Sequence, residues 1–202
     1  MSDEIKDEQR GLLMLITGGV RSGKSSFAEK IAAESGRELI YLATARVEDE
    51  EMRERVARHR SRRPAEVRTI EEPLEPHRIL EKEGEAGRLI LVDCLTILIS
   101  NRLLADIDRH GAVREGEDIF VDEKLLEEAA ERTFDYIKVF SVAARNCPAD
   151  VLVVTNEVGM GVVPAYPLGR VFRDLSGRVN QVLAAAADRV WMVVCGIPQQ
   201  LK

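Results

Sequence analysis

Four residues near the start of the chain have the types and spacing of a phosphate-binding loop. Gly18, Gly23, Lys24 and Ser25 fit the pattern G-x-x-x-x-G-K-[ST], within the stretch ITGGVRSGKSS. The glycines allow backbone N–H groups to turn inward onto phosphates, Lys24 can reach the outer phosphates, and the Ser25 hydroxyl can bind Mg²⁺. The chemistry expected here is the binding of a nucleoside triphosphate.

The elements that flank this loop decide whether the match is more than a chance occurrence in a glycine-rich turn. The apolar run LLMLIT (12–17) predicts a strand buried on both faces, and SSFAEKIAAESG (25–36) predicts a helix that stops at Gly36. A strand before the loop and a helix after it are the context that the motif requires. The positive N-terminal end of that helix adds to the attraction for phosphate.

A nucleotide site of this kind needs an acidic partner near the metal, at the end of another strand. The run RLILVDC (88–94) predicts a buried strand that ends at Asp93, which makes Asp93 the first candidate. The alternative is that Asp93 caps the next helix, as an Asp after a strand often does. Glu157, at the end of DVLVVTNE (150–157), is a second candidate for the same role.

A histidine among arginines is the other group with chemical potential. In EMRERVARHRSRRP (51–64), a continuous helix would place His59 on the same face as Met52 and Val56. The surrounding cations disfavour the imidazolium form and so favour the neutral, nucleophilic form, whereas the helix C-terminus acts in the opposite direction. Clustered arginines are good phosphate ligands, and a neutral imidazole beside them could attack phosphorus. The alternative is a solvated basic helix end.

The remaining pattern predicts one α/β domain. Apolar strands alternate with helices, which indicates a mostly parallel sheet covered by helices on both faces, with ligands bound beyond the carboxyl ends of the strands. Residues 1–11 are expected to be a disordered extension, residues 12–202 the domain, and residues 106–118 a polar insertion of low order. The predicted strands are 12–17, 38–45, 88–94, 150–157 and 188–196, and the predicted helices are 25–36, 48–63, 122–146 and 168–187.

Composition excludes several classes of protein. Of 202 residues, 45% are hydrophobic and 32% charged, as in ordinary globular proteins, and the net charge of −6 argues against broad nucleic-acid binding. No apolar run reaches the ~18 residues that would span a membrane, and the polar start of the chain is not expected to be a secretory signal. Three widely spaced cysteines, Cys94, Cys147 and Cys195, predict reduced thiols and a cytoplasmic location. No role is expected for His77 or His110.

Several separated segments resemble one family in particular. They are TGGVRSGKSSFAE, YLATA followed by DEEMRERVARHRSRRP, LVDCLT, TNEVGMGVVP and GRVFRDLSGRVNQVLAAAADRVWMVVCGIP, and they run in family order from about residue 12 to the C-terminus. The chain resembles the bifunctional adenosylcobinamide kinase / adenosylcobinamide-phosphate guanylyltransferase family of cobalamin biosynthesis. The resemblance implies a P-loop α/β fold with a sheet like that of recombinase-type (RecA-like) ATPases, assembled as a homotrimer.

The resemblance also implies two reactions and a set of site residues. The corrinoid substrate adenosylcobinamide is phosphorylated by a nucleoside triphosphate, ATP or GTP, and its phosphate then receives GMP from GTP through a guanylylated histidine, which falls on His59. Catalytic roles are implied for His59 and Lys24, and Mg²⁺ binding for Ser25 and Asp93. The implied nucleotide-binding residues are Gly18, Gly19, Val20, Arg21, Ser22, Gly23, Lys24, Ser25, Thr44, Ala45, Arg46, Arg62, Arg63, Pro64, Glu71 and Asp93.

Two other functions fit the phosphate loop. One is a P-loop kinase of another small metabolite, without nucleotidyl transfer, in which the basic helix acts only as a lid. The other is a nucleotide-switch ATPase that responds to a macromolecular partner. Transfer of label from the α-phosphorus of GTP would separate the family reaction from both. The sequence leaves open the preferred phosphate donor, the exact corrinoid and its docking site.

Overall fold

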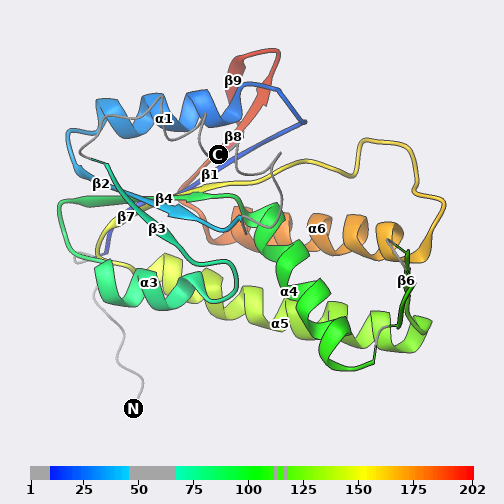
Figure 1. Cartoon of the computed structure of the whole chain (residues 1–202). Coiled ribbons are helices and arrows are strands. Elements are labelled where there is room, and N and C mark those ends of the chain that lie inside the picture. Colours follow the sequence, from blue (N-terminus) through cyan, green and yellow to red (C-terminus); the bar gives the residue numbers. More distant parts are fainter. Residues whose placement is uncertain (1–9, 46–66, 112, 116–117) are drawn as a thin grey trace.

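The computed structural model describes residues 10–45, 67–111, 113–115 and 118–202. A seven-stranded sheet with the order β3-β2-β4-β7-β1-β8-β9 forms its centre, and every neighbouring pair is parallel except β8 and β9 (Figure 1). The predicted α/β class and mostly parallel sheet are confirmed. The strands are β1 (Leu13–Gly18), β2 (Glu38–Ala43), β3 (Arg68–Glu71), β4 (Arg88–Asp93), β7 (Asp150–Val154), β8 (Arg189–Val194) and β9 (Ile197–Gln200).

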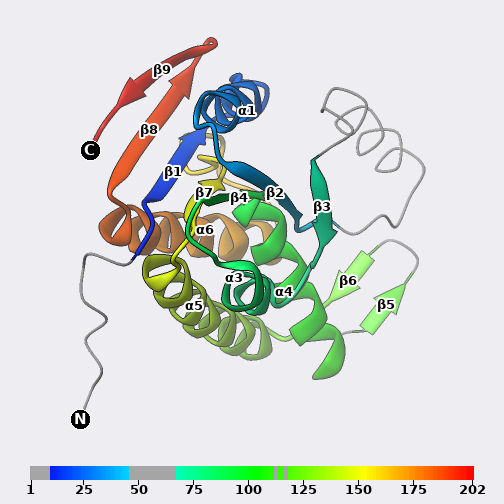
Figure 2. The ribbon, with the colours of Figure 1, turned by 90° about the vertical axis from the view of Figure 1, so that its left-hand side faces the viewer.

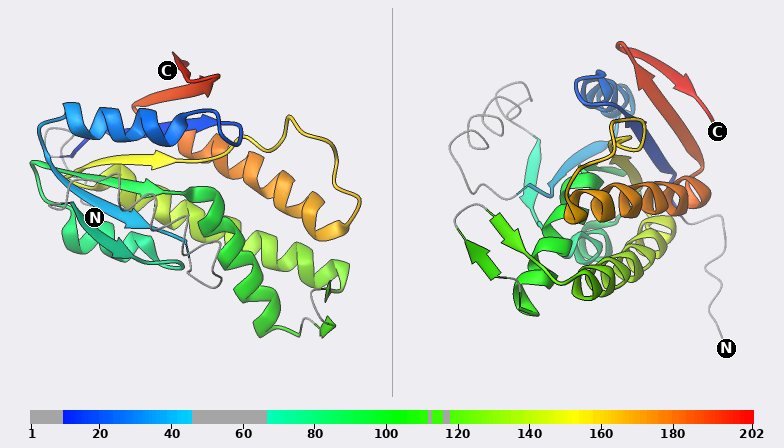
Figure 3. Two further views of the ribbon diagram at one scale, coloured as in Figure 1. Left: turned by 45° about the horizontal axis from the view of Figure 1, so that its top comes forward. Right: turned by 90° about the vertical axis from the view of Figure 1, so that its right-hand side faces the viewer.

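Helices cover both faces of this sheet, as expected. One face is covered by α1, and the other by α3, α4, α5 and α6 (Figures 1 and 3). Successive residues of β1 point to opposite faces, because side chains alternate along a strand: Leu13 and Leu15 join the larger core, and Met14 and Ile16 the smaller core under α1. The helices are α1 (Lys24–Glu34), α3 (Pro76–Glu83), α4 (Leu95–Arg109), α5 (Glu123–Asn146) and α6 (Pro167–Ala186).

The first residues after three central strands, β1, β4 and β7, lie close together. Strand β1 lies between β7 and β8, and β7 lies between β1 and β4 (Figure 2). Because these strands run in parallel, residues 19–23 after β1, Cys94 after β4 and residues 155–157 after β7 gather at one edge of the sheet. The candidate nucleotide site lies at this edge.

Some predicted elements need correction. The five predicted strands and three of the four predicted helices are present with shifted ends, and the fourth helix, 48–63, lies outside the described residues. Strands β3 and β9 and helices α3 and α4 were not predicted. The low order expected for 106–118 is wrong in part, because the last turn of α4 extends to Arg109, and β5 (Val113–Glu115) pairs with β6 (Asp118–Phe120) apart from the main sheet (Figures 2 and 3).

The end of the expected N-terminal extension is also held in place. Arg10 donates two hydrogen bonds to the Asp188 carboxylate, at 2.9 and 3.0 Å, and the Gly11 N–H donates to the Cys147 carbonyl at 2.8 Å. A bidentate ion pair and a backbone bond thus connect these two residues to the domain. Residues 1–9 lie outside the described residues. Among the helices that the structure describes, none is long and apolar enough to cross a membrane.

Candidate functional site

The backbone of the phosphate loop adopts a conformation that requires glycine at two points. Gly18 has φ +152°, and a Cβ there would lie 2.5 Å from the Val193 carbonyl oxygen. Gly23 has φ +97° and forms the N-cap of α1, with a Cβ position 3.0 Å from the Gly196 Cα. Both positions are therefore closed to larger residues by conformation and by contact. The loop matches the sequence motif in geometry as well as in composition.

Hydrogen bonds from both neighbouring strands hold this loop. The N–H of Glu157, after β7, donates to the Gly18 carbonyl at 3.1 Å, and the N–H of Gly196, after β8, donates to the Ser22 carbonyl at 2.8 Å. Within the loop, the Ser22 N–H donates to the Gly19 carbonyl at 3.2 Å. The loop is thus held on two sides by hydrogen bonds to the protein backbone.

The two polar residues at the start of α1 occupy the positions that the motif predicts. Lys24 is buried, and its Nζ donates to the Gly19 carbonyl at 3.1 Å, so the ammonium group lies across the loop. Ser25 follows in the first helical turn and is half-buried. Val20 and Arg21 are exposed at the tip. The buried Ser22 hydroxyl has no hydrogen-bond partner within the described chain, which suits a loop built to bind an oxygen-rich ligand.

Asp93 lies two strands from β1, about 10 Å across the sheet edge. The phenol of Tyr41 donates a hydrogen bond of 2.5 Å to its Oδ2. Among the described residues, no group of three or more His, Cys, Asp or Glu is arranged to hold a metal ion by itself. Ser25 and Asp93 nevertheless fit Mg²⁺, because this ion keeps several waters and binds through one or two protein oxygens together with substrate phosphates.

The Thr44 side chain is used for hydrogen bonds within the fold. Its hydroxyl donates to the Cys94 carbonyl and accepts from the Cys94 N–H, both at 2.8 Å, and the residue is fully buried. Its own carbonyl accepts from the Asn101 amide at 2.7 Å. The hydroxyl hydrogen is used for the bond to Cys94, so a hydrogen bond donated from this hydroxyl to a nucleotide would require that bond to break. Burial raises the pKa of the Cys94 thiol to about 11, so this cysteine is protonated at neutral pH.

The other expected nucleotide contacts are spread along the sheet edge. Glu71 is exposed at the end of β3, four strand spacings from β1, which is about 19 Å. It is therefore too far away to touch phosphates in the loop, and only the distant part of a nucleotide could reach it. Ala45 follows β2 and is half-buried. His59, Arg46, Arg62, Arg63 and Pro64 lie outside the described residues.

Sequence reasoning missed a polar network beside the loop. The Thr96 hydroxyl accepts from the Asn156 N–H at 2.8 Å, and the Thr155 hydroxyl donates to the Asn180 Oδ1 at 2.8 Å. The Asn180 amide in turn donates to the Asn156 carbonyl at 3.1 Å. These bonds join α4, the end of β7 and α6. The polar run TNE (155–157) at the end of an apolar strand was the sequence feature that could have indicated this network. Glu157 itself accepts from the Gly159 N–H at 2.9 Å, which shapes its own loop.

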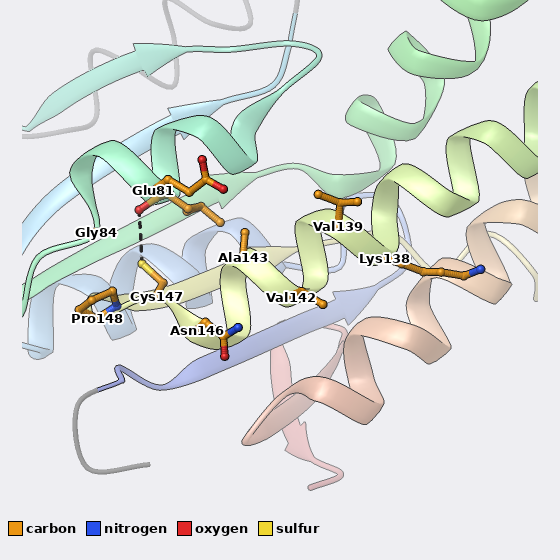
Figure 4. Close-up of a pocket in the computed structure, with 10 residues that line it drawn as sticks. Glu81, Gly84, Lys138, Val139, Val142, Ala143, Asn146, Cys147 and Pro148 are labelled. Atoms are coloured by element: carbon orange, nitrogen blue, oxygen red, sulfur yellow. Dashed lines mark hydrogen bonds between the residues drawn. The ribbon is translucent and has the colours of Figure 1, made fainter. Parts of the chain in front are cut away.

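A separate surface pocket of about 590 Å³ lies between α3 and α5 (Figure 4). Its wall is mainly apolar and includes Val139, Val142 and Ala143, and Cys147 beneath it contacts the Leu80 carbonyl through its sulfur at 3.7 Å. These helices cover the sheet face opposite α1. The pocket therefore does not form part of the phosphate site.

Comparison with known proteins gives consistent matches along the chain. A family model described as cobinamide kinase / cobinamide phosphate guanyltransferase matches residues 14–201. The bifunctional adenosylcobalamin biosynthesis protein CobP of Pseudomonas aeruginosa is 44% identical over 188 residues, which cover 93% of this chain and 96% of the relative. The corresponding protein CobU of Escherichia coli is 39% identical over 191 residues, which cover 95% of this chain and 100% of the relative.

Solved structures of other proteins are also similar. The flagellar accessory protein FlaH from Methanocaldococcus jannaschii is 13% identical, with a TM-score of 0.43, over 96% of this chain and 79% of that chain. The RadB recombinase is 16% identical, with a TM-score of 0.41, over 91% of this chain and 74% of that chain.

Proposed function

The chain belongs to the cobinamide kinase / cobinamide phosphate guanyltransferase family of enzymes, and we propose that it catalyses both reactions in that name. It phosphorylates adenosylcobinamide with ATP or GTP and then transfers GMP from GTP to that phosphate, giving adenosylcobinamide-GDP. The observation that carries the proposal is the family match over residues 14–201. The phosphate loop supports it, because both reactions require the triphosphate of a nucleotide to be held still.

In the kinase reaction, the substrate hydroxyl oxygen attacks the γ-phosphorus. The bond from that phosphorus to the β–γ bridging oxygen breaks, the nucleoside diphosphate leaves, and the hydroxyl proton passes to solvent. The loop N–H groups and Lys24 stabilise the charge on the phosphates, and this electrostatic contribution is the main one expected in phosphoryl transfer. Ser25 and Asp93 would hold Mg²⁺, which neutralises phosphate charge when bound.

In the guanylyl transfer, His59 is the proposed nucleophile. A ring nitrogen attacks the α-phosphorus of GTP, the bond to the α–β bridging oxygen breaks, and pyrophosphate leaves. An oxygen of the corrinoid phosphate then attacks the same phosphorus, the phosphorus–nitrogen bond breaks, and the histidine is restored. Two easier steps replace one difficult step. Support for His59 comes from its place in the segment RHRSRRP, where Arg62 and Arg63 are suited to bind phosphate oxygens.

The proposed assembly state, location and partners also follow the family resemblance. We expect a homotrimer in the cytoplasm that acts on a small-molecule corrinoid, without nucleic acid as a partner. The net charge of −6 supports the last point, because nucleic-acid binding surfaces are basic. Sedimentation of the purified protein tests the assembly state.

Labelling with GTP that is radioactive at the α-phosphorus tests the function. The protein should take up label in a bond that is labile in acid and stable in base, as expected for phosphorus bound to nitrogen. His59→Ala should lose the label and keep GTP binding and some kinase activity. The matched control is His110→Ala, because His110 is an exposed histidine at the end of α4. A folded, GTP-binding wild-type protein that never takes up label would exclude the guanylyl-histidine step.

A further inference from the structure

A buried phenol holds the carboxylate at the end of β4. Tyr41 lies on β2, which pairs with β4 so that Ala43 stands opposite Asp93. Because side chains alternate along a strand, Tyr41 and Ala43 project from the same face of the sheet. The Tyr41 hydroxyl reaches along that face and donates to the Asp93 Oδ2 at 2.5 Å. This length is typical of a hydrogen bond from a hydroxyl to a charged oxygen. A bond of that kind is about twice as strong as one between neutral groups.

The ring of Tyr41 is fixed by packing. Only 6% of the residue is exposed, and it belongs to the smaller core together with Ala28 of α1, Leu91 of β4 and Cys94. The helix on this face of the sheet, α1, is the one that begins with Lys24 and Ser25. The phenol is therefore held on the side of the sheet that carries the phosphate-binding helix, and it cannot turn its hydroxyl to solvent without leaving the core.

We propose that Tyr41 is a positioning residue for the metal-binding carboxylate. It holds Oδ2 of Asp93 and leaves Oδ1 as the oxygen that meets the nucleotide-bound Mg²⁺ or one of its waters. The inference rests on the proposed role of Asp93 in Mg²⁺ binding and names the group that sets its orientation. Partners that orient a metal ligand in this way matter, since their loss costs about 10–100-fold in metal affinity.

Tyr41→Phe is the variant that tests the proposal, because it keeps the buried ring and removes only the donor. Mn²⁺ serves as the probe, with its binding followed by electron paramagnetic resonance in the presence of a non-hydrolysable GTP analogue. Mn²⁺ affinity should fall about 10-fold. Affinity for the analogue without metal should stay within about 2-fold of the wild-type value. General damage to the fold would weaken both affinities, and so it would not produce this difference between them. Thermal unfolding of the variant checks that the fold is kept.

Two further variants make the outcomes distinct. Tyr136→Phe is the matched control. Tyr136 lies on α5, and its hydroxyl is also hydrogen-bonded, at 2.9 Å from the His77 Nδ1. The Tyr136→Phe protein should bind Mn²⁺ as the wild type does. Asp93→Asn should lose most Mn²⁺ affinity. If Asp93→Asn weakens Mn²⁺ binding and Tyr41→Phe does not, the role of Tyr41 is refuted and the metal site stands. If Asp93→Asn has no effect, the proposed metal role of Asp93 fails, and the role of Tyr41 fails with it.

Discussion

Gly23 lies directly against Gly196, so closely that a Cβ on Gly23 would stand 3.0 Å from the Gly196 Cα. The neighbouring bond from the Gly196 N–H to the Ser22 carbonyl, at 2.8 Å, ties the phosphate loop to the turn between β8 and β9. A residue far along the chain thus supports the loop from outside the motif. Together with the φ of +97° at Gly23, this close contact means that a side chain at the motif position would be strained.

Gly23→Ala should therefore weaken nucleotide binding by about 10-fold or more, because a strained backbone position costs on the order of 1–3 kcal/mol and each 1.4 kcal/mol is tenfold in affinity. Calorimetric titration with GTP measures the change. The control is Gly177→Ala within α6, where an added Cβ meets nothing within 4 Å. That variant should bind GTP normally and unfold at the same temperature or slightly higher. Unchanged GTP affinity in a folded Gly23→Ala protein would contradict the loop geometry.

Lys24→Ala should lower the turnover of the kinase reaction by about 100-fold or more, the usual cost of removing a donor aimed at developing charge. The ammonium group already lies across the loop, 3.1 Å from the Gly19 carbonyl oxygen, so it needs little rearrangement to meet a phosphate. Steady-state kinetics with saturating ATP or GTP measures the loss. Lys30→Ala is the control, because Lys30 is exposed on the same helix and pairs with Glu34. Equal turnover of Lys24→Ala and Lys30→Ala would remove Lys24 from the mechanism.

The stability that Asp188 contributes to the fold should decrease in acid. Hydrogen bonds from Arg10, Arg145 and the Leu13 N–H hold the pKa of its carboxyl well below the usual range. A folded-state pKa below the unfolded value gives stability that is fully present above about pH 4 and is lost as the pH falls further. Asp188→Asn should therefore lower the free energy of unfolding on the order of 2 kcal/mol at pH 7 and by less at pH 3.

Urea denaturation at the two pH values measures this effect. Asp174→Asn is the control, since Asp174 is exposed and its Oδ1 lies 3.7 Å from the Arg173 Nε. It should leave stability unchanged at both pH values. A deficit of Asp188→Asn that is as large at pH 3 as at pH 7 would show that packing, and not charge, explains the loss.

The sequence predicted the parts of the site that depend on local pattern. The phosphate loop and Asp93 follow from a motif and from an apolar strand with a polar end. The contacts of Tyr41 and Thr44 could not be predicted, because they depend on β2 lying beside β4, and the residues they touch are about 50 positions away. Helix α4 escaped prediction for a local reason, since its N-cap, Cys94, provides no side-chain hydrogen bond and its apolar start continues the run of β4.

Thr44→Val separates the structural role of Thr44 from the nucleotide contact that the family resemblance implies. Valine keeps the shape and removes both 2.8 Å bonds to the Cys94 backbone, leaving a buried N–H and a buried carbonyl without that partner. The free energy of unfolding should fall by about 1–3 kcal/mol, whereas GTP affinity of the folded protein should stay within about 3-fold. Thr133→Val, at a buried threonine of α5, is the control for the loss of a hydroxyl. If Thr44→Val weakens GTP binding and leaves stability intact, the hydroxyl serves the nucleotide after all, and the bonds to Cys94 are secondary.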